Sequence, residues 1–246
     1  ARAFASMTAF ATLIGLASPM VGGFLAAAIT PEHTLAIDSA LCLLAALIFA
    51  IIREPQRTLS PGHHGVWKDI AEGLHFIRSQ PVIRTLTTLG IGNSVAEGIL
   101  SGLLVASVAQ TFMMDDDGPF VGIAYTALSA GALIGTQLIP VVRERFSVRT
   151  VAVAGLLCGA VGIIGWSQQP HYAVGVGALV IYQVGATSVI LNGISERARL
   201  TPDYLQGRVN TSARMIAWGG QPIGALIGAA AVMHLSVLEA EHVEHA

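Results

Sequence analysis

The residue with the clearest potential for chemistry is Glu97, an acidic side chain inside an apolar run covering approximately 85–112. A charge at the centre of a membrane helix costs at least about 2.5–3.5 kcal/mol, so such residues usually face a cavity or a partner. Asn93 precedes Glu97 by one helical turn, which places both residues on one helix face. We therefore predict that both line a central cavity, where Glu97 exchanges protons or pairs with a cationic substrate. The alternative is a protonated carboxyl group bonded to a neighbouring helix.

Two further polar residues lie in or near apolar runs, Gln183 and Arg214. Gln183 can face a substrate, or it can hydrogen-bond between helices, as polar residues in membrane bundles often do. Arg214 is a further candidate to bind substrate or protons, or, because it lies within a turn or two of the end of its run, its charge can instead reach the membrane interface. Cys42 and Cys158 stand singly in apolar runs and form no CxxC motif, so we predict no metal site and no cofactor.

These residues belong to a chain that is unusually apolar. Of its 246 residues, 53% are hydrophobic and 11% are charged, and the mean hydropathy is +0.67. A soluble domain usually carries about 25% charged residues, so lipid must surround much of this surface. We predict an all-α fold, a polytopic transmembrane helix bundle. Its seven apolar runs, each long enough to cross the bilayer, cover approximately 3–29, 35–52, 85–112, 119–142, 150–166, 172–194 and 209–235.

The basic residues are sorted between alternate connections of these runs. All thirteen lysines and arginines lie before the first run, in 53–84, in 143–149 or in 197–214. The other connections and the tail 236–246 contain none. Because cytoplasmic loops of membrane proteins are enriched in Lys and Arg, we predict a cytoplasmic N-terminus and an extracytoplasmic tail. The expected location is the inner (cytoplasmic) cell membrane, with the bilayer as partner and no nucleic acid.

The longest connection, 54–84, carries an amphipathic pattern after a segment rich in Pro and Gly. Its apolar residues recur at helical spacing, at Val66, Trp67, Ile70, Leu74 and Ile77. Lys68, Asp69, Glu72 and Arg78 are then available for the solvated side. We predict a helix that lies on the inner membrane surface and links two bundles.

Small residues at helical spacing predict close packing between the membrane helices. The pairs are Gly98–Gly102, Gly131–Gly135, Gly155–Gly159, Gly220–Gly224 and Gly224–Gly228, and each permits two backbones to approach. The first and last runs also resemble each other, since Pro19 aligns with Pro222 and Thr8 with Thr211. With five runs between them, this similarity indicates a parallel six-helix repeat of the kind found in some transporters.

Several segments resemble the major facilitator superfamily. Ser18-Pro19-Met20-Val21-Gly22-Gly23 resembles the antiporter signature G-P-x-x-G-G of the family's fifth helix, with Ser18 in place of the first Gly. Residues 37–55 and 67–84 resemble the sixth helix and the central loop of the drug and siderophore exporter branch (the enterobactin-exporter type). Residues 207–210 and 218–224 resemble that branch's eleventh helix.

This resemblance implies about seven spans, helices five to eleven, of a twelve-helix major facilitator fold. Residues 1–53 would form the last two helices of the N-terminal bundle, 54–84 the cytoplasmic linker and 85–235 a C-terminal bundle of five helices. The remaining helices of the full-length chain are then required partners. The implied function is export of drugs, siderophores or similar small molecules, coupled to protons, by alternating access. A fragment is expected to be inactive alone.

The resemblance also assigns a role to the basic loop that contains Arg143, Arg145 and Arg149. It occupies the position of the family's second cytoplasmic charge motif, although the Gly and Asp of the full motif are missing. The family implies ion pairs between helices that stabilise the outward-facing state. A loop that only sets the topology is equally consistent with the sequence.

Other classes of protein fit the sequence less well. The chain contains no GxxxxGK[ST], HExxH or GxSxG motif, so we predict that it is not an enzyme. A seven-helix receptor would normally have an external N-terminus, and the only lysine, Lys68, lies in a connection where it cannot hold retinal. A membrane remnant that transports nothing stays open as the alternative.

Overall fold

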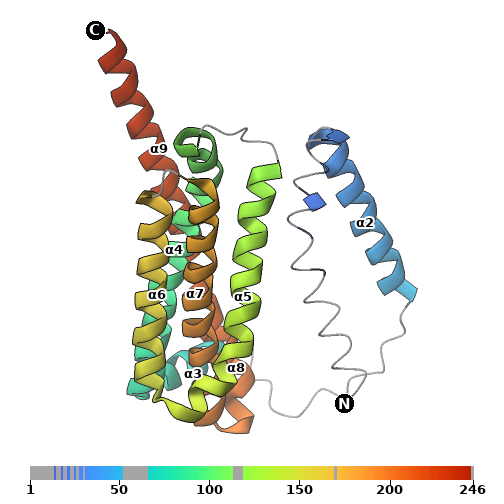
Figure 1. Ribbon diagram of the computed structural model, residues 1–246. Coiled ribbons are helices and arrows are strands. Elements are labelled where there is room, and N and C mark those ends of the chain that lie inside the picture. The colour runs from blue at the N-terminus through green and yellow to red at the C-terminus, as the bar shows by residue number, and fades with distance from the viewer. Residues whose placement is uncertain are drawn as a thin grey trace.

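The computed structural model shows a bundle of long helices (Figure 1). The structure describes residues 31–51, 66–112, 119–168 and 171–244, together with positions 14, 18, 21, 22, 25, 28 and 29. No strand occurs in these ranges. The elements are α2 (Pro31–Ile51), α3 (Val66–Ser79), α4 (Pro81–Phe112), α5 (Pro119–Arg145), α6 (Val148–Gln168), α7 (Tyr172–Leu200), the 3-10 turn η1 (Asp203–Leu205), α8 (Gln206–Trp218) and α9 (Gly220–Glu244).

Six helical stretches in the described ranges are long and apolar enough to cross a membrane. They are Glu32–Ile51, Pro81–Ala109, Pro119–Arg145, Val148–Gln168, Tyr172–Leu200 and Asp203–Met233. They correspond to six of the seven predicted runs, and the seventh, 3–29, lies mostly outside the described residues. Helices satisfy every internal backbone hydrogen bond within one segment, which hydrocarbon requires. The predicted all-α transmembrane bundle is therefore confirmed.

Helices α4 to α9 pack into one bundle around α4 and α7. Helix α7 lies against α6, α5 and α4, while α4 also packs against α8 and α9. Gly98 of α4 and Gly224 of α9 lie in this contact, where a Cβ on either residue would collide with the backbone of the facing helix. Gly155 of α6 and Gly185 of α7 meet in the same way. These close approaches confirm that predicted pairs such as Gly98–Gly102 and Gly220–Gly224 are contact positions.

One end of this bundle, here called the basic end, contains the connections 143–149 and 197–208 together with α3. A small apolar cluster fills it, formed by Ile77, Ile83, Leu205, Val209 and Ala213. A larger cluster lies among α4 to α7 and includes Leu104, Val108, Ala124, Trp166 and Leu179. The grouping of basic residues at one end agrees with the sorting seen in the sequence.

Helix α3 lies where the sequence predicts an amphipathic helix, and it packs against α8. Asp69 and Glu72, expected on the solvated side, are only partly exposed, and both form ion pairs with Arg208 at the start of α8. Gly73 lies against the backbone of Arg208, and Ile77 is buried beside Val209. The large indole of Trp67 remains exposed. Since α3 and α8 share buried apolar side chains and ion pairs, α3 is part of the bundle's basic end.

The last predicted span differs from expectation in two ways. Gly219 interrupts it, so that α8 ends at Trp218 and α9 begins at Gly220, close to Pro222. Helix α9 then continues to Glu244, although the sequence suggested a separate tail from residue 236. Positions 229–244 contain neither Pro nor Gly, the two residues that most disfavour a helix, so the helix can continue. The end of α9 extends beyond the neighbouring helices (Figure 1).

Helix α2 stands apart from the bundle and has no extensive contact with another described helix (Figure 1). Its apolar side chains, including Leu35, Leu47 and Phe49, are exposed around its whole circumference. An apolar helix without a polar face requires lipid or other helices as its surroundings.

Candidate functional site

A cavity of about 290 Å³ lies among α4, α5, α7 and α9. It combines one carboxylate with amides, hydroxyl groups and aliphatic surface, which is the usual composition of a small-molecule site. Its walls are formed by Glu97, Leu100, Ser101, Tyr125, Leu128, Ser129, Ala132, Gln183 and Gln221. Two of the four predicted substrate or proton residues, Glu97 and Gln183, therefore lie at one cavity.

Glu97 is the only acidic side chain of that cavity wall. It is partly buried, and within the described residues no hydrogen bond or ion pair holds its carboxylate. On α7, the buried hydroxyl group of Tyr182 also has no hydrogen-bond partner in the described part of the chain. A carboxylate without a fixed partner in a cavity can take up a proton or a cation.

Gln183 faces Glu97's cavity from α7. Its Nε2 atom is 3.4 Å from the hydroxyl oxygen of Thr187, one turn further along the same helix. This contact is long for a hydrogen bond, so the amide retains capacity to bind a ligand. The alternative prediction, an amide that joins two helices, has no such bond in the described residues.

The structure does not place Asn93 and Arg214 at this cavity. Asn93 is buried, and its Nδ2 atom lacks a hydrogen-bond partner among the described residues. It lies one turn before Glu97 on α4 and is not among the residues that line the cavity. Arg214 instead lines a second cavity nearer the basic end, and its guanidinium lies 4.6 Å from the centre of the Trp218 ring.

A group of ion pairs at the basic end surrounds Glu196 of α7. Its carboxylate bonds to Arg143 of α5 at 2.8 Å and to Arg199 at 2.5 Å. Arg143 also donates to the carbonyl oxygen of Asn192 at 3.4 Å, and Asn192 Nδ2 donates to the carbonyl oxygen of Val148 at 2.9 Å. Arg143 thus links α5 and α7.

Among the described residues, the other predicted site residues make no such ion pairs. Arg145 and Arg149 are exposed and have no ion pair within the described ranges. In the antiporter-like segment, Ser18 and Gly22 are helical at isolated positions. Pro19 and Gly23 lie outside the described residues.

Sequence reasoning missed Tyr125, Gln221, Ser101, Ser129 and Glu196. Helical spacing offered a partial signal, because Ser101 follows Glu97 by one turn and Ser129 follows Tyr125 by one turn. Nothing in the spacing, however, indicates that these two pairs from different helices face one cavity. Glu196 had the weaker signal, since it stands among arginines where the sequence suggests only a boundary.

A bundle of lipid-compatible helices that surrounds a mixed polar cavity defines a multi-pass membrane protein suited to small molecules. A family model described as Major Facilitator Superfamily matches residues 1–225. The chain belongs to this superfamily and is thus a membrane transporter of a family that does not consist of enzymes. No curated protein and no solved structure matches the chain significantly. No group of three or more potential metal ligands occurs in the described residues.

Proposed function

We propose that this chain forms part of a proton-coupled exporter of drugs, siderophores or similar small molecules that works by alternating access. The observation that carries the proposal is Glu97, a carboxylate at a cavity among four helices that has no fixed partner among the described residues. Proton binding at such a site changes the charge that a substrate meets, which couples two ligands through one group.

The proposed arrangement in the membrane follows from the basic end. Since cytoplasmic loops are rich in Lys and Arg, the basic end would face the cytoplasm, with the protein in the inner membrane. Residues 1–53 would belong to the N-terminal bundle, 54–84 to the linker and 85–235 to the C-terminal bundle. Further helices would supply the opposite wall of the Glu97 cavity, because transporter sites lie between repeats.

The cavity's chemistry supports an amphiphilic substrate. Leu100, Leu128 and Ala132 offer apolar surface, while Gln183 and Gln221 offer amide groups for orientation. Glu97 in its ionised form would favour a cationic group on the substrate. The segments 37–55 and 67–84, which resemble the drug and siderophore exporter branch, support the same substrate classes.

The remaining predicted motifs would control the exchange between states. The ion pair between Arg143 and Glu196 joins α5 to α7, and it would stabilise the outward-facing state. The segment from Ser18 to Gly23 would serve as the antiporter signature of the fifth helix.

The test is uphill export by everted membrane vesicles that contain the intact protein, with Glu97→Gln as the variant. The neutral amide has the shape of the carboxyl group but cannot exchange a proton at neutral pH. In everted vesicles export moves the substrate into the lumen. We expect only the wild type to accumulate a hydrophobic cation in the lumen against its gradient, with release of protons from the lumen. Downhill exchange of the same cation should persist in the variant.

Glu144→Gln is the matched control, because Glu144 is exposed at the basic end and lies outside the cavity. It should export like the wild type. If Glu97→Gln still drives uphill export at the wild-type rate, Glu97 does not couple transport to protons. If the wild type exports neither hydrophobic cations nor siderophores, the proposed substrate classes are wrong.

A further inference from the structure

Two adjoining cavities at the basic end form a second site that is separate from the Glu97 cavity. Their volumes are about 290 and 260 Å³, and they share Ile194, Arg197 and Asn210. The first lies between the end of α7 and the start of α8, and the second continues along α7 towards α4. Arg197 therefore stands at the junction of two open spaces.

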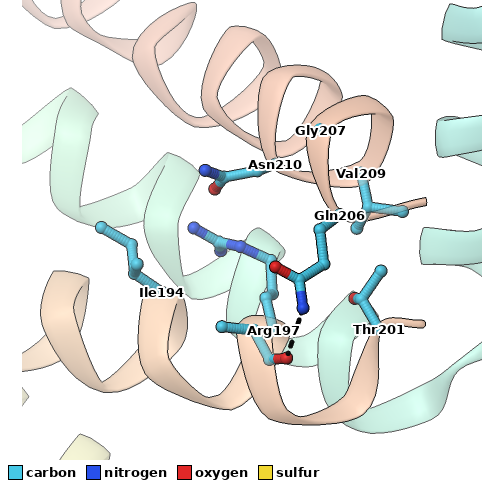
Figure 2. A pocket seen from close by; sticks show the side chains of 8 residues that line it. Ile194, Arg197, Thr201, Gln206, Gly207, Val209 and Asn210 are labelled. Atoms are coloured by element: carbon cyan, nitrogen blue, oxygen red, sulfur yellow. Dashed lines mark hydrogen bonds between the residues drawn. The ribbon is translucent and has the colours of Figure 1, made fainter. Parts of the chain in front are cut away.

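Arg197 is an unusual arginine because it is buried with no counter-charge among the residues that the structure describes. The residue is only 8% exposed, and its Nε atom has no hydrogen-bond partner in the described part of the chain. Figure 2 shows its side chain extending from α7 towards Asn210 on α8. A buried guanidinium is costly unless an anion or several acceptors surround it.

Three of the acidic side chains at this end are engaged by other arginines, and Glu144 and Asp203 are exposed. Glu196 bonds to Arg143 and Arg199. Asp69 and Glu72 both pair with Arg208. No Asp or Glu of the described residues lines either cavity that Arg197 borders. Among the described residues, the counter-charge for Arg197 is therefore missing.

Other donors surround the same space. The buried hydroxyl group of Thr201 lines the first cavity and has no hydrogen-bond partner in the described ranges. Asn210 contributes an amide group to both cavities, and Arg214 contributes a second cation to one of them. The Nε2 atom of Gln206 is already engaged, because it donates to the carbonyl oxygen of Ala198 at 3.4 Å, a bond drawn in Figure 2, and to Asp203 Oδ1 at 3.1 Å. The walls are thus rich in donors and contain no carboxylate.

We propose that Arg197, Asn210 and Arg214 form a binding site for a phosphate-bearing anion at the basic end of the bundle. A guanidinium presents a planar fork of donors that matches two oxygens of such a group. A tetrahedral phosphate has enough acceptor oxygens to engage the amide, the hydroxyl group and the second cation as well. The phosphate belongs to a lipid headgroup or to a free phosphate ion, and the two sources are separable by experiment.

The experiment uses the intact protein purified in detergent and in nanodiscs. Binding of inorganic phosphate is measured by equilibrium dialysis in detergent. Lipid preference is measured as enrichment of phosphatidylglycerol over phosphatidylcholine, in native mass spectra of protein released from equimolar nanodiscs. The variants are Arg197→Gln, Arg197→Lys and Arg214→Gln. Arg84→Gln is the control, because Arg84 is exposed near the same end and lines neither cavity.

We expect Arg197→Gln to weaken binding of the preferred probe about tenfold or more, since a hydrogen-bonded charge is removed. Arg197→Lys should recover only part of the affinity because it loses the fork, and Arg84→Gln should bind like the wild type. Saturable phosphate binding identifies a free ion, whereas selective enrichment of phosphatidylglycerol identifies a lipid headgroup.

Arg214 is exposed, so Arg214→Gln tests the site even if Arg197→Gln does not fold. This variant should weaken binding severalfold. The proposal is overturned if the wild type binds neither probe. It is also overturned if Arg214→Gln and Arg197→Lys bind both probes with wild-type affinity.

Discussion

Two glutamates in one helix bundle, Glu97 and Glu196, differ completely in their surroundings. Glu196 is 3% exposed at its side chain and is held by Arg143 and Arg199 at the basic end. Glu97 lies partly buried at a cavity, and within the described residues no cation pairs with it. The first charge is compensated by the fold itself, whereas the second is left available to a ligand. The location of a glutamate and the cations beside it, rather than the residue type, therefore decide whether its carboxylate stabilises the fold or is available to a ligand.

Close helix packing occurs near both glutamates. Helices α5 and α7 approach closely at Gly131 and Gly135, and the ion pair between Arg143 and Glu196 lies at the basic end of the same contact. Glycine contacts also adjoin the Glu97 cavity, since Gly98 of α4 lies against Gln221 of α9 and Gly131 of α5 lies against Gln183 of α7. The two places therefore differ in the compensation of charge rather than in the closeness of the helices.

The largest expected effect on stability comes from Glu196→Ala. Removing this carboxylate leaves Arg143, whose side chain is 20% exposed, without its ion-pair partner. Loss of one member of a buried pair costs about 3 kcal/mol or more, so the free energy of unfolding should fall by that amount. Unfolding in detergent measures it, with exposed Glu144→Ala as control. An unchanged free energy of unfolding would show that Glu196 is not structural.

The two arginines that pair with Glu196 should contribute differently to the free energy of unfolding. Arg143→Gln removes a partly buried, inter-helix bond to a charged group and should cost about 2 kcal/mol. Arg199→Gln should have a much smaller effect, because its side chain is 67% exposed and its pairing lies within one helix. Equal losses of unfolding free energy in the two variants would contradict the importance of burial.

Much of the bundle was predictable because hydrocarbon imposes a length and a composition on each span. The runs 119–142 and 150–166 correspond to α5 and α6 for this reason. Glycine spacing likewise identified Gly98 and Gly224 as contact positions. The break at Gly219 and the continuation of α9 to Glu244 were missed, since hydropathy alone does not fix where a helix pauses or ends.

The candidate site was predictable only in part. Glu97 stood out because a charge inside an apolar run needs a reason. Asn93 shares its helical face, yet it is buried one turn earlier in α4 and does not line the cavity. Tyr125 and Gln221 come from helices far away in sequence, and no local pattern brings them together. Tertiary packing therefore decides which residues of a face share one cavity.

The smallest expected effect on stability comes from Glu97→Gln, the variant that should abolish uphill export. In the described structure the carboxylate makes no ion pair or hydrogen bond, and glutamine fills nearly the same volume. The free energy of unfolding should therefore stay within about 0.5 kcal/mol of the wild type, as for substitutions that disturb no packed or bonded feature. The same detergent unfolding series used for Glu196→Ala measures it. A loss as large as that of Glu196→Ala would mean that Glu97 is compensated by a partner within the protein, and the distinction between the two glutamates would disappear.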